Sequence, residues 1–100
     1  MAEESTMFIG AKPFMNYVTG VVMQFSAKGI SEVTVKARGK FISRAVDVAE
    51  VASKRFLLGT VATKSIKIDS EEFKNQEGRQ VRVSTIEITL AKTSQGLQGQ

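Results

Sequence analysis

The chain has 100 residues and a net charge of +4, with 42% hydrophobic residues and neither histidine nor cysteine. This composition is typical of one folded domain with a modest core, near the size at which a partner subunit adds stability, and it excludes global disorder, disulfides and thiolate metal sites. No apolar run reaches the roughly 20 residues of a membrane span, and the acidic start Met-Ala-Glu-Glu is unlike a signal peptide, so we expect an intracellular protein.

The N-terminal third predicts a short strand followed by an amphipathic helix. Residues 1–6 are expected to be a flexible polar tail, residues 7–10 a short apolar strand, and Pro13 lies in the favoured first turn of the helix. Gly29 is a natural end for this helix. We interpret the aromatic side chains of its apolar face as core, not as platforms for stacking bases. That face is broad: Phe14, Met15, Tyr17, Val18, Val21, Val22 and Phe25.

A second strand, residues 30–38, leads through Gly39 into a second helix, residues 40–58. Four cations and no acid lie within nine residues at this junction. Cations fixed where a rigid strand becomes a helix suit a polyanion, although basic side chains also simply solvate the end of a strand. The helix that precedes this strand lacks a capping side chain, so its first N–H groups, beside Lys12, are available to an anion or to water. The junction cations are Lys36, Arg38, Lys40 and Arg44.

The apolar face of the second helix is wider than one sheet needs. It spans about half the helical wheel, more than the ~100° stripe that covers a single sheet. A second surface must therefore bury part of it, and we expect a homodimer. The apolar positions are Phe41, Ile42, Ala45, Val46, Val48, Ala49, Ala52, Phe56 and Leu57.

The C-terminal third predicts a β-hairpin from residues 64–74 and 80–92, with a turn at Asn75–Gly78. The side chains of Ile66, Ile68, Ile86, Ile88 and Leu90 are expected to face inward. The apolar residues near the tip have the opposite phase, which indicates a bulge or a strong twist around Ser84 and Thr85 and an arm that leaves the body. Residues 93–100 are expected to be a flexible tail. The opposite-phase residues are Phe73, Val81 and Val83.

These elements predict an α+β fold in the order β-α-β-α-β-β. The first β-α-β unit requires a parallel pair with a right-handed crossover, and the hairpin is antiparallel. We expect a two-layer sandwich over residues 7–92, with a mixed four-stranded sheet, two helices on one face, and a protruding C-terminal β-hairpin arm.

Several separated motifs, in the same order, resemble the Alba family of archaeal chromatin proteins. They include Ile-Gly-Ala-Lys-Pro at the first loop and Val-Lys-Ala-Arg-Gly-Lys at the junction. The resemblance runs from about residue 7 to residue 92. The segments that carry it are Ile9–Val18, Val35–Lys40, Ile42–Asp47, Lys54–Phe56 and Glu77–Ile88.

The resemblance implies a dimer that coats and compacts double-stranded DNA without sequence preference and also binds RNA, at the archaeal nucleoid in the cytoplasm. It assigns phosphate contacts of a basic central body to Lys12, Lys36, Arg38, Lys40 and Arg44. It assigns minor-groove contacts of the arm to Arg79 and Arg82, and a contact between neighbouring dimers to Phe56. It implies no cofactor and no metal.

One position departs from the family. The family loop commonly carries two lysines where this chain has Ala11 and Lys12, and acetylation of the first is associated with weaker DNA binding. Ala11 has no side-chain amine, so that switch does not carry over to this position, and Lys12 supplies the charge of the loop alone.

Three classes of function compete with this interpretation. An enzyme is disfavoured, because the chain lacks a Walker-type phosphate loop and because the neighbouring Glu71 and Glu72 point to opposite faces of a strand. An RNA-binding protein of RNA processing or protection stays open, since RNA phosphates suit the same cations; the arm offers only Phe73 for stacking unpaired bases, which favours a duplex. A structural oligomer with an incidental basic face is the third.

Overall fold

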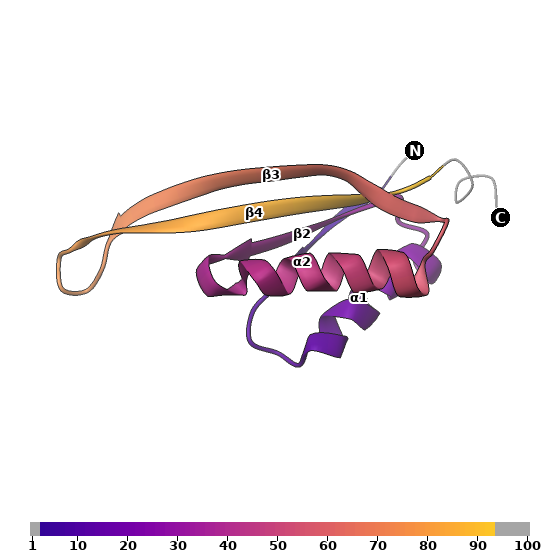
Figure 1. Ribbon diagram of the computed structural model, residues 1–100, viewed down its shortest axis with the longest axis horizontal. Coiled ribbons are helices and arrows are strands. Elements are labelled where there is room, and N and C mark those ends of the chain that lie inside the picture. The colour runs from indigo at the N-terminus through magenta and orange to yellow at the C-terminus, as the bar shows by residue number, and fades with distance from the viewer. Residues whose placement is uncertain (1–2, 94–100) are drawn as a thin grey trace.

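The computed structural model describes residues 3–93, which fold into one sheet with both helices on the same side (Figure 1). The four strands lie in the order β1-β2-β4-β3; β1 and β2 are parallel and the other neighbours antiparallel. The predicted order and layers are therefore confirmed. The elements are β1 (Glu4–Phe8), α1 (Phe14–Ser26), β2 (Glu32–Arg38), a 3₁₀ turn η1 (Gly39–Phe41), α2 (Ile42–Val51), a π-helical segment η2 (Ala52–Phe56), β3 (Val61–Lys74) and β4 (Gln80–Lys92).

The starts of three strands differ from the sequence-based ones, and β3 begins at Val61 instead of residue 64. Strand β1 begins at Glu4, so residues 4–6 belong to the sheet and not to the predicted tail. These residues are polar because β1 is an edge strand and one face of the sheet is uncovered. Strand β2 begins at Glu32 because the N–H of Ile30 is still bonded to the carbonyl of Gln24, at the exit of α1. The predicted C-terminal tail lies outside the described residues, apart from Thr93.

The second helical segment starts as a 3₁₀ turn, continues as α2 and ends as a π-helical turn. Gly39, at the start, has a φ of +56°, a conformation that side chains other than glycine seldom adopt. This turn lets the chain reverse from β2 onto the helical layer within one residue. None of the helices within residues 3–93 combines the length and the apolar character needed to cross a membrane.

The core lies between the helices and the inner face of the sheet. Small alanines on α2 and η2 let these segments approach closely, while Met15 of α1 is 46% exposed and lies outside the core, contrary to the predicted face. The largest fully buried side chains come from all layers: Val18 and Val21 of α1, Val33 and Val35 of β2, Val48 of α2 and Leu90 of β4.

The hairpin of β3 and β4 extends beyond the other strands as an arm. Residue Arg38, the last of β2, is paired with Thr85, so residues 70–84 have no third strand beside them and form the arm (Figure 1). At its tip the Asn75 side chain accepts hydrogen bonds from the N–H groups of Glu77 and Arg79, which confirms the predicted turn.

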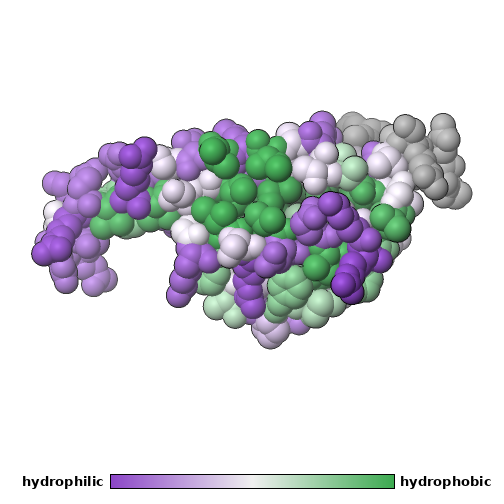
Figure 2. All heavy atoms as spheres, in the orientation of Figure 1, coloured by the Kyte–Doolittle hydropathy of each residue, from purple (hydrophilic) through white to green (hydrophobic). Residues whose placement is uncertain are grey.

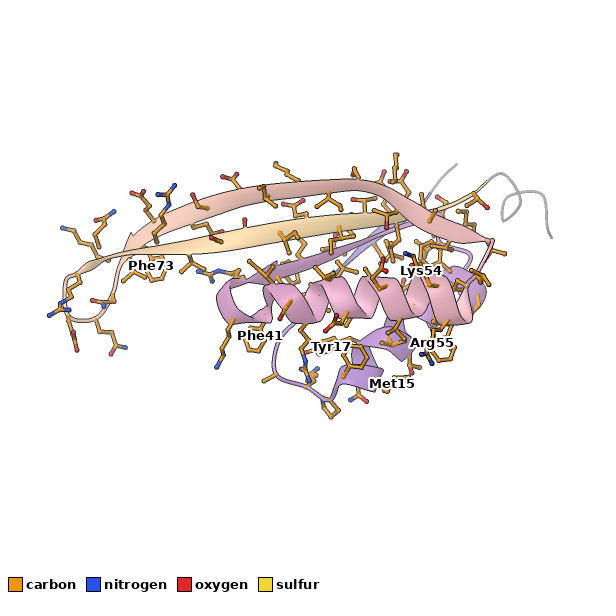
Figure 3. All side chains as sticks on the ribbon, in the orientation of Figure 1. Met15, Tyr17, Phe41, Lys54, Arg55 and Phe73 are labelled. Carbon is orange, nitrogen blue, oxygen red and sulfur yellow. The ribbon has the colours of Figure 1, made fainter. Side chains whose placement is uncertain are left out.

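Of the two predicted alternatives around Ser84 and Thr85, a bulge or a strong twist, the bulge is absent. Pairing is regular through both residues, and the register shifts instead between Thr63 and Ser65 near the base of the hairpin. The opposite phase of the tip is accommodated by twist. Phe73 shares its hairpin face with Glu87, which lies on the uncovered side of the body, yet its ring points to the side on which the helices lie (Figure 3).

Ile66 and Ile68 lie on the inner face of the sheet, as predicted, but they are not buried in the single chain. They share a face with the buried Ile88 and Ile86, their cross-strand partners, but are 61% and 77% exposed. The reason is the strand order. Strand β3 is an edge strand next to β4, and α2 packs on β2 and β4, so α2 does not cover the inner face of β3.

Candidate nucleic-acid interface

The predicted phosphate-binding residues gather at one end of the sheet. The loop 9–13 follows β1 and the turn η1 follows β2; because these strands are parallel, both connections emerge at the same end. Lys12 lies on the loop, Lys40 on η1 and Arg44 in the first turn of α2. The hairpin extends beyond the body at this same end of the sheet, so the arm begins beside η1 (Figure 1).

Two side chains hold the loop that carries Lys12. The hydroxyl of Tyr17 accepts hydrogen bonds from the N–H groups of Gly10, at 2.9 Å, and of Lys12, at 3.1 Å. The guanidinium of Arg44 donates to the carbonyls of the same two residues and lies 5.8 Å from the centroid of the Tyr17 ring. Tyr17 is thus core at one end and a loop anchor at the other, and Lys12 is presented on a fixed backbone.

Arg44 is therefore a positioning residue in this structure. It is only half-exposed, and one of its terminal nitrogens is engaged by the two carbonyls. The direct phosphate contact predicted for Arg44 stays a prediction. The 3₁₀ and α-helical turns place its side chain toward the loop because they bring residue 44 one turn beyond Lys40.

Lys36 and Arg38 face away from the helices. Strand alternation puts both on the open face, the sheet face that no helix covers, while Val35 and Ala37 between and beside them are buried. The Nζ of Lys36 lies 3.6 Å from Glu87, and the Nη2 of Arg38 lies 3.2 Å from Glu71. The predicted basic junction is therefore divided between the strand-helix turn and the open face.

Two exposed aromatic rings lie beneath these open-face cations. The Nζ of Lys36 is 5.6 Å from the centroid of the Phe8 ring, and the Cζ of Arg38 is 5.8 Å from that of Phe73. Phe8 is 70% exposed. A groove of about 510 Å³ opens between the end of the body and the base of the arm. It is lined by both open-face cations, both carboxylates, Phe8, Gly39, Phe41 and Val83, among others.

The arm carries mixed charge. Residues 70–84 contain three acids and three cations. The Nε of Arg82 approaches the hydroxyl of Ser70 at 3.4 Å, and within residues 3–93 the Arg79 side chain makes neither an ion pair nor a hydrogen bond. At the base of the hairpin, the Glu32 carboxylate accepts a hydrogen bond from Lys64 and so raises the pKa of that lysine above its ordinary value. Lys64 is thus held across the sheet.

Phe56 lies at the end of η2 and is 54% exposed. A shallow pocket of about 180 Å³ beside it is lined by α1 residues Val18, Thr19, Val22 and Met23. The Phe56 ring is therefore not buried in the core. It lies at the opposite end of the helical segment η1-α2-η2 from η1.

Sequence reasoning missed Glu71, Glu87 and Phe8 as members of this surface. The sequence does show which of these residues share a strand face, since Glu71 and Phe73 are two positions apart on one strand. What was missing was the sheet order, which places β4 between β2 and β3 and so brings Glu87 opposite Lys36 and Glu71 within reach of Arg38.

The family model and the relatives that match this chain all name the same family, Alba. Residues 5–70 match the sequence model of the Alba family. The DNA/RNA-binding protein Alba of Nanoarchaeum equitans is 60% identical over 87 residues, which cover 86% of this chain and 96% of that protein. DNA/RNA-binding protein Alba 1 of Archaeoglobus fulgidus is 53% identical over 89 residues, covering 89% of this chain and 97% of that protein.

A solved structure agrees with the fold. Alba from Thermoplasma volcanium superposes with a TM-score of 0.78 at 43% identity, covering 86% of this chain and 98% of that one. The family match spans more than half of the chain, and the two relatives cover most of it. The chain belongs to the Alba family.

Proposed function

We propose that this chain coats and compacts double-stranded DNA without sequence preference, as a homodimer, and that it also binds RNA. The observation that carries the proposal is that three cations make no ion pair within residues 3–93: Lys12 and Lys40, at the end of the sheet where the arm begins, and Arg79, at the turn of the arm. Such charges contact phosphate, which carries no sequence information. The relatives named above are DNA/RNA-binding proteins. The proposed role is architectural, not catalytic, at the nucleoid of an archaeal cytoplasm.

The arm suits the minor groove. It is a two-stranded ribbon with no third strand or helix over residues 70–84, and it carries Arg79 and Arg82. Arginine side chains are attracted to the negative potential of a narrow minor groove without reading bases individually. In the proposed complex the body lies on the phosphate backbone and each of two arms follows the groove.

A second copy of the chain is the proposed cover for the apolar surface beside α2. Ile66 and Ile68 are largely exposed, and Val46 of α2 is 39% exposed. Figure 2 shows apolar atoms gathered over the middle of the hairpin, next to α2. An exposed patch of this kind is typical of a subunit interface, and the width of the apolar face of α2 supports the same conclusion.

An RNA-binding role in processing or protection is the second candidate. Phe8 lies beneath Lys36 and Phe73 lies beneath Arg38, so the surface around these two cations offers two rings on which unpaired bases can stack, whereas the sequence had indicated only Phe73. The cations above those rings suit the phosphates of either nucleic acid.

Lys12→Ala should weaken binding to every duplex alike, and lower the slope of log affinity against log salt by about one for each phosphate that the variant no longer binds. Fold stability should hardly change, because Lys12 is exposed. Lys28→Ala is the matched control: it removes the same charge at the opposite end of α1, where no binding is proposed. Fluorescence anisotropy with duplex DNA, duplex RNA and single strands at matched salt measures both variants. Equal affinities for the two variants would remove Lys12 from the interface; a strong preference for single-stranded RNA would favour the second candidate.

Phe56 is proposed to contact the next dimer along DNA. Phe56→Ala should leave affinity for a short duplex unchanged and make the binding isotherm on long DNA less steep. A buried phenylalanine costs ~3–5 kcal/mol on truncation, and a ring that is half-exposed should cost clearly less. Phe8→Ala, which truncates another exposed ring, is the control and should leave the steepness intact. A large loss of melting temperature with unaltered steepness would show that Phe56 serves the fold alone.

A further inference from the structure

Two carboxylates on the open face lie where phosphate groups would bind. Glu71 Oε1 is 3.2 Å from Arg38 Nη2, and Glu87 Oε2 is 3.6 Å from Lys36 Nζ. We infer that these carboxylates take the place of phosphates in the free protein, and that nucleic acid binds there by exchanging phosphate for carboxylate. The inference rests on the proposed function and adds to it two acidic residues that limit the affinity.

The ion pairs are weak enough to be exchanged. The side chains of Arg38 and Glu71 are 57% and 55% exposed, and those of Lys36 and Glu87 are 36% and 37% exposed. Pairs as exposed as these contribute little to stability because water screens them. A phosphate offers several acceptor oxygens to the flat guanidinium of Arg38. It can therefore replace the single contact with the Glu71 carboxylate by two parallel hydrogen bonds.

Lys36 and Arg38 keep their positions when their ion pairs with Glu87 and Glu71 are broken. Phe8 lies under Lys36 and Phe73 under Arg38, and attraction between a cation and a ring face does not depend on either glutamate. Lys36 and Arg38 are two residues apart on one strand, so both project from the same face beside the groove at the base of the arm. A nucleic-acid strand lying in this groove meets both.

The Arg38–Glu71 pair also ties the arm to the body. Arg38 ends β2, whereas Glu71 lies on the part of β3 that extends past β2. The ion pair with Glu71 and the contact with the Phe73 ring both join the Arg38 side chain to the arm. When a phosphate replaces Glu71 as the partner of Arg38, the ion pair is lost and the contact with the Phe73 ring remains. Nucleic-acid binding therefore loosens the base of the arm.

Glu71→Gln tests the exchange, with Glu72→Gln as its control. Glu72 is the next residue on the same strand, opposite Arg82 on the other face, and its substitution removes the same charge. At fixed low salt, Glu71→Gln should tighten binding of a random-sequence DNA duplex by roughly 2- to 30-fold per dimer, since an exposed ion pair is a weak competitor. It should also steepen the salt dependence by up to about one per chain. Glu72→Gln should do clearly less.

The same substitution in an Arg38→Ala background makes the test specific. Without Arg38, the gain from Glu71→Gln should shrink to that of Glu72→Gln. Equal gains for the two glutamates in the native background, or a gain from Glu71→Gln that persists without Arg38, would overturn the inference while leaving the proposed function intact. A wild-type protein that fails to bind the duplex at all would overturn both. Circular dichroism of each variant confirms that the fold is retained.

Discussion

Raising the salt concentration from 50 to 200 mM is expected to weaken binding of a random-sequence duplex by ~10³–10⁵. The range follows from the structure. Lys12, Lys40 and Arg79 make no ion pair within residues 3–93, and as proposed phosphate contacts they contribute six side chains in the proposed dimer. If Lys36 and Arg38 exchange their carboxylates for phosphate, the number rises to ten. Each bound phosphate releases counterions from the duplex, so the slope of log affinity against log salt should lie near −0.9 per phosphate.

The measurement is an anisotropy titration repeated over a series of salt concentrations and with several unrelated sequences. Thermal melting of the protein alone over the same series separates weaker binding from loss of fold. A flat salt response, or one sequence bound much more tightly than its random competitors, would contradict a complex built on phosphate contacts.

Ile68→Lys is expected to make the chain monomeric at micromolar concentration, where we propose that the wild-type chain is a homodimer. Ile68 is 77% exposed in the single chain, so its replacement costs the isolated fold little. Full burial of one isoleucine contributes ~1.5–3 kcal/mol, and a two-fold interface loses this twice, so dissociation should become about 10²–10⁴ times more favourable. The buried lysine, without a partner, adds a further penalty.

Phe8→Lys is the matched control for this substitution. It introduces the same side chain at an apolar position that is 70% exposed, but on the open face of the sheet and away from α2. Light scattering over a dilution series should show this variant as a dimer. An Ile68→Lys variant that stays dimeric would place the interface elsewhere, and a wild-type protein that is monomeric and well folded at all micromolar concentrations would exclude the dimer.

The layers of the fold could be predicted because periodicity reports which residues of an element share a face. The 3.6-residue pattern located both helices, and Gly39 and Gly78 marked the two sharp reversals, where the structure has positive φ angles. Strand β1 was placed too late because its residues 4–6 are polar, and an edge strand with an uncovered face needs few apolar side chains.

What the sequence could not predict depends on the order of the strands. The pattern of β3 correctly puts Ile66 and Ile68 on the inner face, but their exposure follows from β3 lying at the edge, beyond the reach of α2. The ion pairs of Lys36 and Arg38 have the same origin, since they join residues about 30 to 50 positions apart in sequence. Local patterns carry no information about such long-range neighbours.

The shift of register at the base of β3 affects whether neighbouring protein molecules can associate edge to edge. An edge strand presents unpaired N–H and C=O groups to which another chain can add, and molecules packed side by side on a duplex would bring such edges together. In β3 the register breaks between Thr63 and Ser65, and the exposed Lys67 and Lys74 belong to the same edge strand. Irregular pairing and charged side chains both oppose the addition of a further strand. The same edge that lacks a helix is thereby protected from fibre-like growth.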